Sequence, residues 1–211
     1  MIKDRIRYQI LRKKPDPKGL VFVIGLSKTA TTSISEALQI LGYNSIHYAP
    51  MIKLKSNNVS FHWPWWLGKY QAFSDLPVAW SYKHLMKIFS SSTFILTTRE
   101  KDSWLESCKT HFNEERYHNA VKNPEWKVNL ALNKEVYGSN IFDKDKFSNA
   151  YDQNLNNVTR DFKNKDNFFK IDICSGEGWD QLCKILQKDT PLAPFPKSNT
   201  KAMNTQLAAS V

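Results

Sequence analysis

A strand, a turn and a helix within residues 21–42 constrain the fold of this chain more than any other feature. The segment reads VFVIGLSKTATTSISEALQILG. The apolar run VFVI ends at Gly25, which predicts a short parallel strand buried on both faces. Apolar residues then recur at the spacing of one helix face, and Gly42 follows as a stop signal; they are Ile34, Ala37, Leu38 and Leu41.

The loop between this strand and helix resembles a phosphate-binding loop without its lysine. Counted from Gly25, the G-x-x-x-x-G-K-[ST] pattern of P-loop nucleoside triphosphatases places its second glycine at Ala30 and its lysine at Thr31. The basic residue of this loop is instead Lys28. Small residues let a backbone wrap an anion, and the unpaired N–H groups and dipole of the helix attract it. An ordinary capped helix with a solvated Lys28 explains the same letters, so the loop alone leaves both interpretations open.

The remaining pattern alternates between strands and helices. Strands are expected at 45–49, 93–98 and 168–173, and helices from Pro77, after residue 98, over 147–162 and over 178–186, whereas 57–72 reads as irregular and 114–142 stays unassigned. This order predicts an α/β fold, a three-layer parallel sheet with helices on both faces. Ligands of such sheets bind beyond the carboxyl ends of the strands, where GLSKTATT and TTREKDSW both fall.

Length and composition fit an ordinary globular protein with an anionic partner. The 211 residues are 41% hydrophobic and 24% charged, and the net charge is +10. We expect a basic arm over 1–19, one domain over 20–200 and a frayed tail over 201–211. Without an apolar run of about 20 residues or a signal-peptide core, the expected location is the cytoplasm, with no transmembrane segment. The basic arm is better explained by solvation than by nucleic-acid binding.

Cysteine and histidine spacing argues against a metal centre. The three cysteines form no C-x-x-C and the five histidines no H-x-x-x-H, so neither a disulfide framework nor a metal site is expected.

A second candidate anion-binding element follows the strand at 93–98. Arg99 directly follows that strand and Ser107 lies two turns into the next helix, and together they can hold one phosphate. A surface ion pair explains Arg99 equally well when it is considered alone.

Taken together, four segments resemble the PAPS-dependent sulfotransferases, over residues 20–112 and 168–199. SKTATTS stands where that family has P-K-S-G-T-T-W, and REKDSWLES reproduces its R-x₇-S element with the same spacing. FSDLP is similar to its T-H-L-P element, and GWDQLCKIL with PFPKSN resembles its closing helix and tail, especially in the branch with an R-T-G-T loop. The resemblance implies a P-loop-NTPase-like sulfotransferase fold and the donor 3′-phosphoadenosine-5′-phosphosulfate (PAPS), without a metal.

The resemblance also implies residue roles. Lys28 would neutralise the leaving 5′-phosphate oxygen, backbone N–H groups of 29–33 would hold that phosphate, and Arg99 with Ser107 would hold the 3′-phosphate. Two departures are that the family's glycine is Ala30 and its adenine-stacking aromatic is Ser33. The implied nucleotide-binding set is Lys28, Thr29, Ala30, Thr31, Thr32, Ser33, Arg99, Ser107 and Lys197.

Three residues are candidates for the base that accepts the proton of the acceptor hydroxyl. Asp75 occupies the slot of the histidine in T-H-L-P, Glu36 lies one turn into the first helix, and His47 ends the second strand. Asp75 can instead be an ordinary cap of the helix that begins near Pro77.

The sequence does not choose the acceptor. Trp63, Trp65 and Trp66 can stack on a small-molecule acceptor or belong to the core or a lid, and a carbohydrate, a lipid headgroup and a phenol all stay open. Alternative functions are a P-loop-like kinase, and a non-catalytic binder of anions or nucleic acid, although no nucleic-acid-binding motif supports the last.

Overall fold

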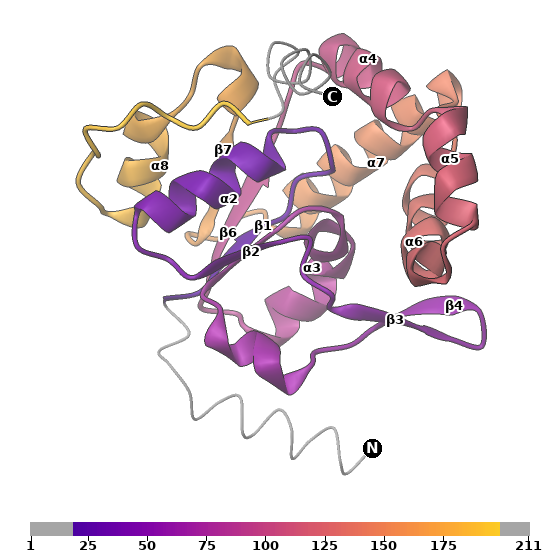
Figure 1. Ribbon diagram of the computed structural model, residues 1–211. Helices are drawn as coiled ribbons and strands as arrows, with labels where there is room; N and C mark the ends of the chain where they lie inside the picture. The colour runs from indigo at the N-terminus through magenta and orange to yellow at the C-terminus, as the bar shows by residue number, and fades with distance from the viewer. Residues whose placement is uncertain (1–18, 199–211) are drawn as a thin grey trace, which may run out of the picture.

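The protein is built on a five-stranded parallel sheet, seen in a computed structural model that describes residues 19–198 (Figure 1). The strand order is β2-β5-β1-β6-β7. Every pair of neighbours in this sheet is parallel. The strands are β1 (Val21–Val23), β2 (Ser45–His47), β5 (Ala72–Ser74), β6 (Thr93–Thr97) and β7 (Phe168–Ile171).

Helices connect these strands, and an antiparallel hairpin is inserted before β5. The hairpin pairs β3 (Ile52–Lys55) with β4 (Asn58–Phe61). The α-helices are α2 (Thr31–Ile40), α3 (Leu76–Ile88), α4 (Lys101–His111), α5 (Glu114–Val121), α6 (Lys127–Tyr137), α7 (Lys144–Asp161) and α8 (Trp179–Leu186). Short 3₁₀ helices are η2 (Trp65–Lys69), η3 (Pro124–Trp126) and η4 (Ile173–Ser175).

The sheet is the middle of three layers. Val21 and Val23 of β1 pack with buried residues of α2 and α8 on one face. Phe22, between them, packs with residues of α3 and α7 on the other face. This alternation follows from the two-residue period of a strand and buries both faces. The predicted α/β fold, a parallel sheet with helices on both sides, is confirmed.

The element that sequence analysis missed is β5, which lies between β1 and β2 near the middle of the sheet. It has only three residues, and all three are buried. Its apolar part is the pair Ala72 and Phe73, which is too short for periodicity to distinguish from a loop. The hairpin was also missed, because residues from 57 onward were interpreted as irregular. Its turn places Ser56 and Asn57 at φ 49° and 64°, the left-handed conformation of tight hairpin turns.

The order of the strands determines which loops meet. Because all five strands are parallel, their carboxyl ends lie along one edge of the sheet. His47 ends β2, Asp75 follows β5, Lys28 follows β1 and Arg99 follows β6. These four residues therefore come from four consecutive positions in the sheet.

Gly25, two residues after β1, lies very close to the last residue of β6. A Cβ at this position would lie 1.9 Å from Thr97 Oγ1 and 2.4 Å from Thr97 O. The second atom is backbone within the sheet, so it cannot move without disturbing the pairing of β6. A glycine is required here by contact, not by φ.

We therefore expect Gly25→Ala to destabilise the fold by about 3 kcal/mol, the upper end of overpacking effects. The midpoint of thermal unfolding should fall by about 6–12 °C for a chain of this size. Gly19→Ala is the matched control, since its added Cβ would meet nothing within 4 Å. Equal midpoints for the two variants would contradict the contact argument.

Candidate active site

The loop after β1 has the backbone shape of an anion-binding concavity. Lys28 and Ala30 adopt left-handed φ angles of 73° and 64°, on either side of Thr29. Left-handed residues that interrupt a turn make successive backbone N–H groups converge, which is the geometry that binds anions. The tip is anchored because Thr29 Oγ1 donates to Leu26 O at 2.7 Å and lies 2.7 Å from Thr97 Oγ1. Since the Thr29 proton is used, Thr97 of β6 is the donor in the second bond.

The loop leads directly into α2. Ala30 is the residue before the helix and has no side chain that can cap it, and within residues 19–198 no side chain makes a capping bond at this end. The positive end of the helix dipole therefore faces the concavity. Of the hydroxyl residues here, Thr31 and Ser33 are buried, whereas Thr32 is half-buried.

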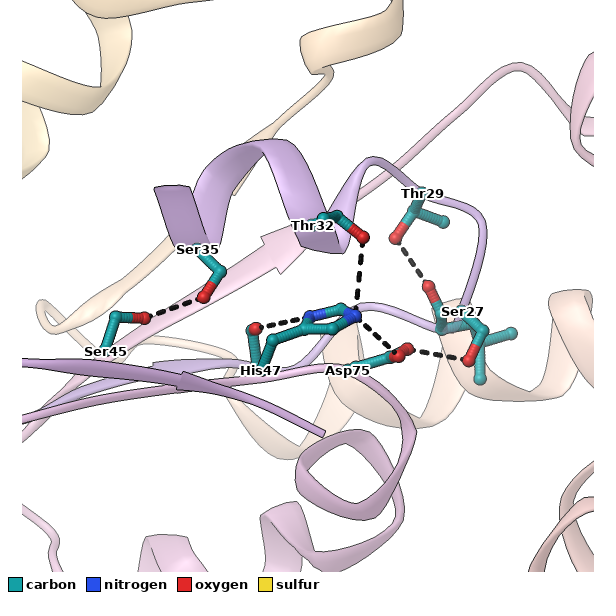
Figure 2. Close-up of polar contacts among 9 residues, drawn as sticks. Ser27, Thr29, Thr32, Ser35, Ser45, His47 and Asp75 are labelled. Carbon is teal, nitrogen blue, oxygen red and sulfur yellow. Dashed lines mark hydrogen bonds and ion pairs between the residues drawn. The ribbon is translucent and has the colours of Figure 1, made fainter. Parts of the chain in front are cut away.

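Asp75 joins three of the strand-end loops. Its Oδ1 accepts a hydrogen bond of 2.7 Å from Ser27 Oγ in the loop after β1. Its Oδ2 lies 3.1 Å from Nε2 of His47, which ends β2. Figure 2 shows the carboxylate between these two partners. Asp75 precedes α3, and its side chain makes no capping hydrogen bond of the usual kind to that helix. The backbone N–H of Leu76, the first residue of α3, makes a lesser contribution to its lowered pKa.

The backbone of Asp75 is strained. Its φ of 78° and ψ of −175° lie in a region that only glycine occupies freely. Such conformations cost about 1–3 kcal/mol and persist only where the surroundings enforce them. Here the carbonyl of Asp75 accepts bonds from the N–H groups of Val78 and Ala79. This backbone conformation directs the carboxylate toward Ser27 and His47.

His47 is held from both sides of its ring. Nδ1 lies 3.0 Å from Ser74 Oγ, and Nε2 lies 3.4 Å from Thr32 Oγ1 as well as near Asp75 (Figure 2). Burial raises the pKa of Asp75, but the hydrogen bonds and charge of His47, together with the bond from Ser27, outweigh it and hold that pKa below its usual value. Asp75 is therefore a carboxylate at neutral pH, paired with a ring that is 34% exposed.

Arg99 lies against the same loop. Its Nη1 donates to Lys28 O at 3.3 Å, and its Nε donates to Ser103 Oγ at 2.9 Å. The backbone around it is held by Tyr151, whose hydroxyl donates to Arg99 O at 2.5 Å. In addition, Trp104 Nε1 donates to Ser27 O at 2.9 Å and so ties α4 to the loop. The two basic residues that were predicted from separate segments are thus brought together.

Lys28 is a half-buried cation among other charges. Burial lowers its pKa, and the positive charges of Arg116 and Arg99 lower it further, against the opposing effects of Cys108 and Asp75. A site with this balance gains electrostatic energy when an anion enters, because the anion offsets both the lost hydration and the mutual repulsion.

Other predicted site residues lie at the margin. Glu36 is exposed, and its carboxylate accepts a hydrogen bond from the Ser198 hydroxyl. Ser33 Oγ accepts from Ser198 N at 3.1 Å, so both residues secure the segment after α8 against α2. Lys197 is exposed on that segment. Ser107 is half-buried one turn beyond Ser103, which is the serine that bonds Arg99.

The three tryptophans do not act as one group. Trp63 is buried and packs against the core rings Phe22, Phe73 and Phe89. Trp65 is 82% exposed. Trp66 is half-buried and meets the ring of Tyr70 edge-on. Trp63 is therefore a core residue and not part of an acceptor-stacking surface.

Sequence reasoning missed several residues that position the site. Ser27, Ser74, Ser103, Trp104 and Tyr151 all bond to its groups. The spacing of Arg99 and Ser103, one helical turn apart, was an available signal. No local signal marks Tyr151, which lies 52 residues from its partner.

The comparison with protein families identifies the class. A model described as a sulfotransferase domain matches residues 20–204. The chain therefore belongs to the sulfotransferase family, whose activity is sulfuryl transfer, and its parallel sheet with flanking helices is the P-loop-like fold expected for that family. A comparison with curated proteins gives no match.

Two further observations concern only residues 19–198. None of their helices combines the length and the apolarity that crossing a membrane requires. They also contain no group of three or more His, Cys, Asp or Glu side chains placed to hold a metal ion.

The left-handed loop predicts an unusual effect of glycine. A non-glycine residue in this conformation destabilises the folded state by about 1–2 kcal/mol, which glycine would relieve. Glycine also increases the entropy of the unfolded chain, which offsets about 0.4–1 kcal/mol of that gain. We expect Ala30→Gly to raise the free energy of unfolding by about 0.5–1 kcal/mol in urea titrations. Ala37→Gly, inside α2 and buried in the core, should lower it by about 1 kcal/mol or more. A loss of stability in both variants would contradict the assigned loop conformation.

The lowered pKa of Asp75 predicts a pH-dependent contribution to stability. A carboxyl group whose pKa is lower in the folded than in the unfolded state stabilises above the unfolded pKa of about 3.9, and this contribution is lost as the pH falls through the folded pKa. Asp75→Asn should therefore lose about 1–3 kcal/mol at pH 7 in urea unfolding, and less below pH 4. A difference between the two proteins that stays constant from pH 7 to pH 3 would rule out the ionised pair.

Proposed function

We propose that this sulfotransferase moves a sulfuryl group from PAPS to a hydroxyl group of a small-molecule acceptor. The observation that carries the proposal is the bond from the Arg99 guanidinium to the backbone of Lys28. It brings two cationic residues, from the loops after the adjacent strands β1 and β6, to one concavity. A ligand with two separate anionic groups suits that arrangement better than a single phosphate does.

The residues present fit this nucleotide. The left-handed loop and the start of α2 offer convergent N–H groups for the 5′ end, and Arg99 with Ser103 and Ser107 offers donors for the 3′-phosphate. When bound, PAPS supplies an activated sulfuryl group, and the 5′-phosphate is the leaving group. Where a P-loop nucleoside triphosphatase has its phosphate-binding lysine, this chain has the buried Thr31. A kinase is therefore the weaker alternative.

Lys28 and the loop would stabilise the leaving group. As the bond between sulfur and the 5′-phosphate oxygen breaks and the bond to the acceptor oxygen forms, negative charge grows on the phosphate. Lys28 Nζ and the loop N–H groups are the donors that face such a charge. They are preorganised by the anchoring of Thr29 and by Arg99, so little rearrangement is needed when the charge develops.

The pair of Asp75 and His47 is our choice for the base. Asp75 is ionised, is held by Ser27, and lies close enough to Lys28 for its charge to affect the lysine pKa. The proton of the acceptor hydroxyl would pass to this pair, with His47 as the more exposed member. Glu36 is the weaker candidate because its carboxylate is engaged by Ser198.

Nucleotide binding tests the donor. The bisphosphate product of PAPS should raise the unfolding midpoint more than ATP with Mg²⁺ does, and Arg99→Ala should weaken its binding about 10- to 100-fold, the loss of about 1.5–3 kcal/mol expected for a charged hydrogen bond. Arg160→Ala removes the same charge from an exposed position on α7 and should have no effect. Calorimetric titration provides the affinities. Stronger stabilisation by ATP with Mg²⁺ would instead favour the kinase.

Transfer kinetics test the role of Lys28. With radiolabelled PAPS and an acceptor found by screening, Lys28→Ala should lower the transfer rate by about 100-fold or more, because the lost interaction is strongest in the transition state. Affinity for the bisphosphate should fall by a smaller factor. An unchanged rate would remove Lys28 from the mechanism.

A further inference from the structure

Exposed lysines and indole rings gather on the hairpin, on η2 and at the end of α3. We call this set the basic aromatic surface. All of its members are exposed except one half-buried tryptophan; they are Lys53, Lys55, Trp65, Trp66, Lys69 and Lys87. None of the groups assigned to the candidate active site belongs to it, so its composition is not explained by the proposed chemistry.

Packing makes the hairpin, η2 and the end of α3 neighbours. Phe61, the last residue of β4, stacks on the ring of His84 in α3, with the ring centres 4.9 Å apart. Phe61, Trp66 of η2 and Met86 of α3 are half-buried and pack against one core cluster. Lys87 lies three residues beyond His84 on the same helix, which is about one turn. The three elements therefore surround one part of the core.

The exposed indole of Trp65 is held by a buried anchor. Leu67 of η2 is fully buried in the same core cluster. A 3₁₀ helix has three residues per turn, so Trp65, two positions earlier, points in a different direction and is exposed. Beside it, Trp66 meets the ring of Tyr70 edge-on, and Lys69 Nζ lies 5.2 Å from the centre of the same ring. The fold thus holds a large apolar side chain in solvent next to a cation.

The hairpin turns its lysines away from the protein. Its strands alternate, so one face carries Ile52 and Val59, which pack in a second core cluster. The other face carries Lys53 and Lys55, which pair across the hairpin with Ser60 and Asn58. Both lysines are exposed, and Figure 1 shows the hairpin extending away from the sheet.

The charge of this part of the chain has one sign. Residues 37–99 contain a single acidic residue, Asp75, which is buried and paired with His47. Of the five lysines in this range, Lys83 pairs with Asp161 of α7 at 3.4 Å. The other four lysines form no ion pair within residues 19–198. The exposed charges that this stretch contributes are therefore all positive, and they favour an anionic partner.

An anionic bilayer matches both kinds of residue on this surface. Indole rings prefer the boundary between headgroups and acyl chains, and each lysine near an anionic leaflet strengthens the attraction. The long apolar stem of a lysine can also lie along the boundary while its ammonium group stays in water. Protein–protein interfaces are instead depleted in lysine, which makes a protein partner the poorer match.

We propose that the basic aromatic surface docks the protein on an anionic lipid bilayer. Trp65 enters the headgroup layer, and the lysines of the hairpin, η2 and α3 bind lipid phosphates and carboxylates. The contact is peripheral, since it involves side chains of a short 3₁₀ helix and a hairpin. The proposal depends neither on the donor nor on the acceptor of the transfer reaction.

Vesicle sedimentation tests the role of the lysines. The full chain should bind vesicles made of equal parts of phosphatidylcholine and phosphatidylserine, and should not bind vesicles of phosphatidylcholine alone. A triple variant, Lys53→Gln with Lys55→Gln and Lys69→Gln, should lower the partition coefficient by about 100-fold, since each lysine at an anionic surface contributes about fivefold.

A second triple variant controls for overall charge. Lys127→Gln with Lys163→Gln and Lys184→Gln removes the same charge from exposed lysines outside the basic aromatic surface. Its partition coefficient should fall by less than about tenfold, because those side chains act on the bilayer only at a distance that salt screens. Equal losses in the two triple variants would show that net charge alone drives binding, and would overturn the proposal.

A tryptophan variant tests insertion. Trp65→Ala should lower the partition coefficient by about tenfold or more, because the indole would no longer leave water on binding. Trp126→Ala, which removes another exposed tryptophan on η3, should leave it unchanged. Vesicles with brominated acyl chains should quench the fluorescence of the wild-type protein, and most of that quenching should be absent in Trp65→Phe. The thermal midpoint of each variant shows that it is folded.

Three results would overturn membrane docking. The first is a wild-type protein that does not bind the phosphatidylserine vesicles. The second is full binding by Trp65→Ala. The third is a wild-type dimer in solution that Trp65→Ala dissociates while neither protein binds vesicles, which would assign the surface to a second copy of the chain. Affinity for the bisphosphate product of PAPS should be the same in all of these variants, so failure here leaves the proposed donor site untouched.

Discussion

The carboxylate of Asp75 is the contact on which the arrangement of the site depends. Its two oxygens engage Ser27 and His47, so that the loops after β1, β5 and β2 are joined at one point. Arg99 adds the loop after β6 by bonding the backbone of Lys28. Four strand ends are therefore connected through side chains as well as through the sheet.

The site stores strain that the surrounding fold enforces. Lys28, Ala30 and Asp75 all have positive φ angles, and none of them is glycine. Conformations of this kind persist only where the surrounding structure enforces them, and they are common at functional sites. The tight contact at Gly25 and the buried bond between Thr29 and Thr97 hold the first loop. Asp75 is held by the start of α3.

The sequence predicted the fold class and singled out two strand-end segments that the structure brings together, because both depend on local patterns. The strand before Gly25, the helix after it and the position of Arg99 at a strand end are all visible in short windows. β5 was not predicted because a strand of three buried residues shows no hydrophobic periodicity, although it lies between β2 and β1 in the sheet. The partners of Asp75 could not be predicted, since Ser27 is 48 residues away and only strand order makes them neighbours. Helices α5 and α6 were left unassigned because α5 has no buried residue and α6 has two, so neither shows a continuous apolar face. The roles assigned to Lys28, Arg99, Asp75 and His47 stay predictions until ligands are bound.

The central claim is that Lys28 and Arg99 hold opposite ends of one doubly phosphorylated nucleotide. Phosphorus NMR of 3′-phosphoadenosine-5′-phosphate during titration with the protein tests it most directly, since the two phosphates have separate resonances. The account predicts that both resonances shift with wild-type protein, that Arg99→Ala removes chiefly the shift of the 3′-phosphate, and that Lys28→Ala alters chiefly that of the 5′-phosphate. Shifts of one resonance only, or identical effects of the two substitutions, would contradict it.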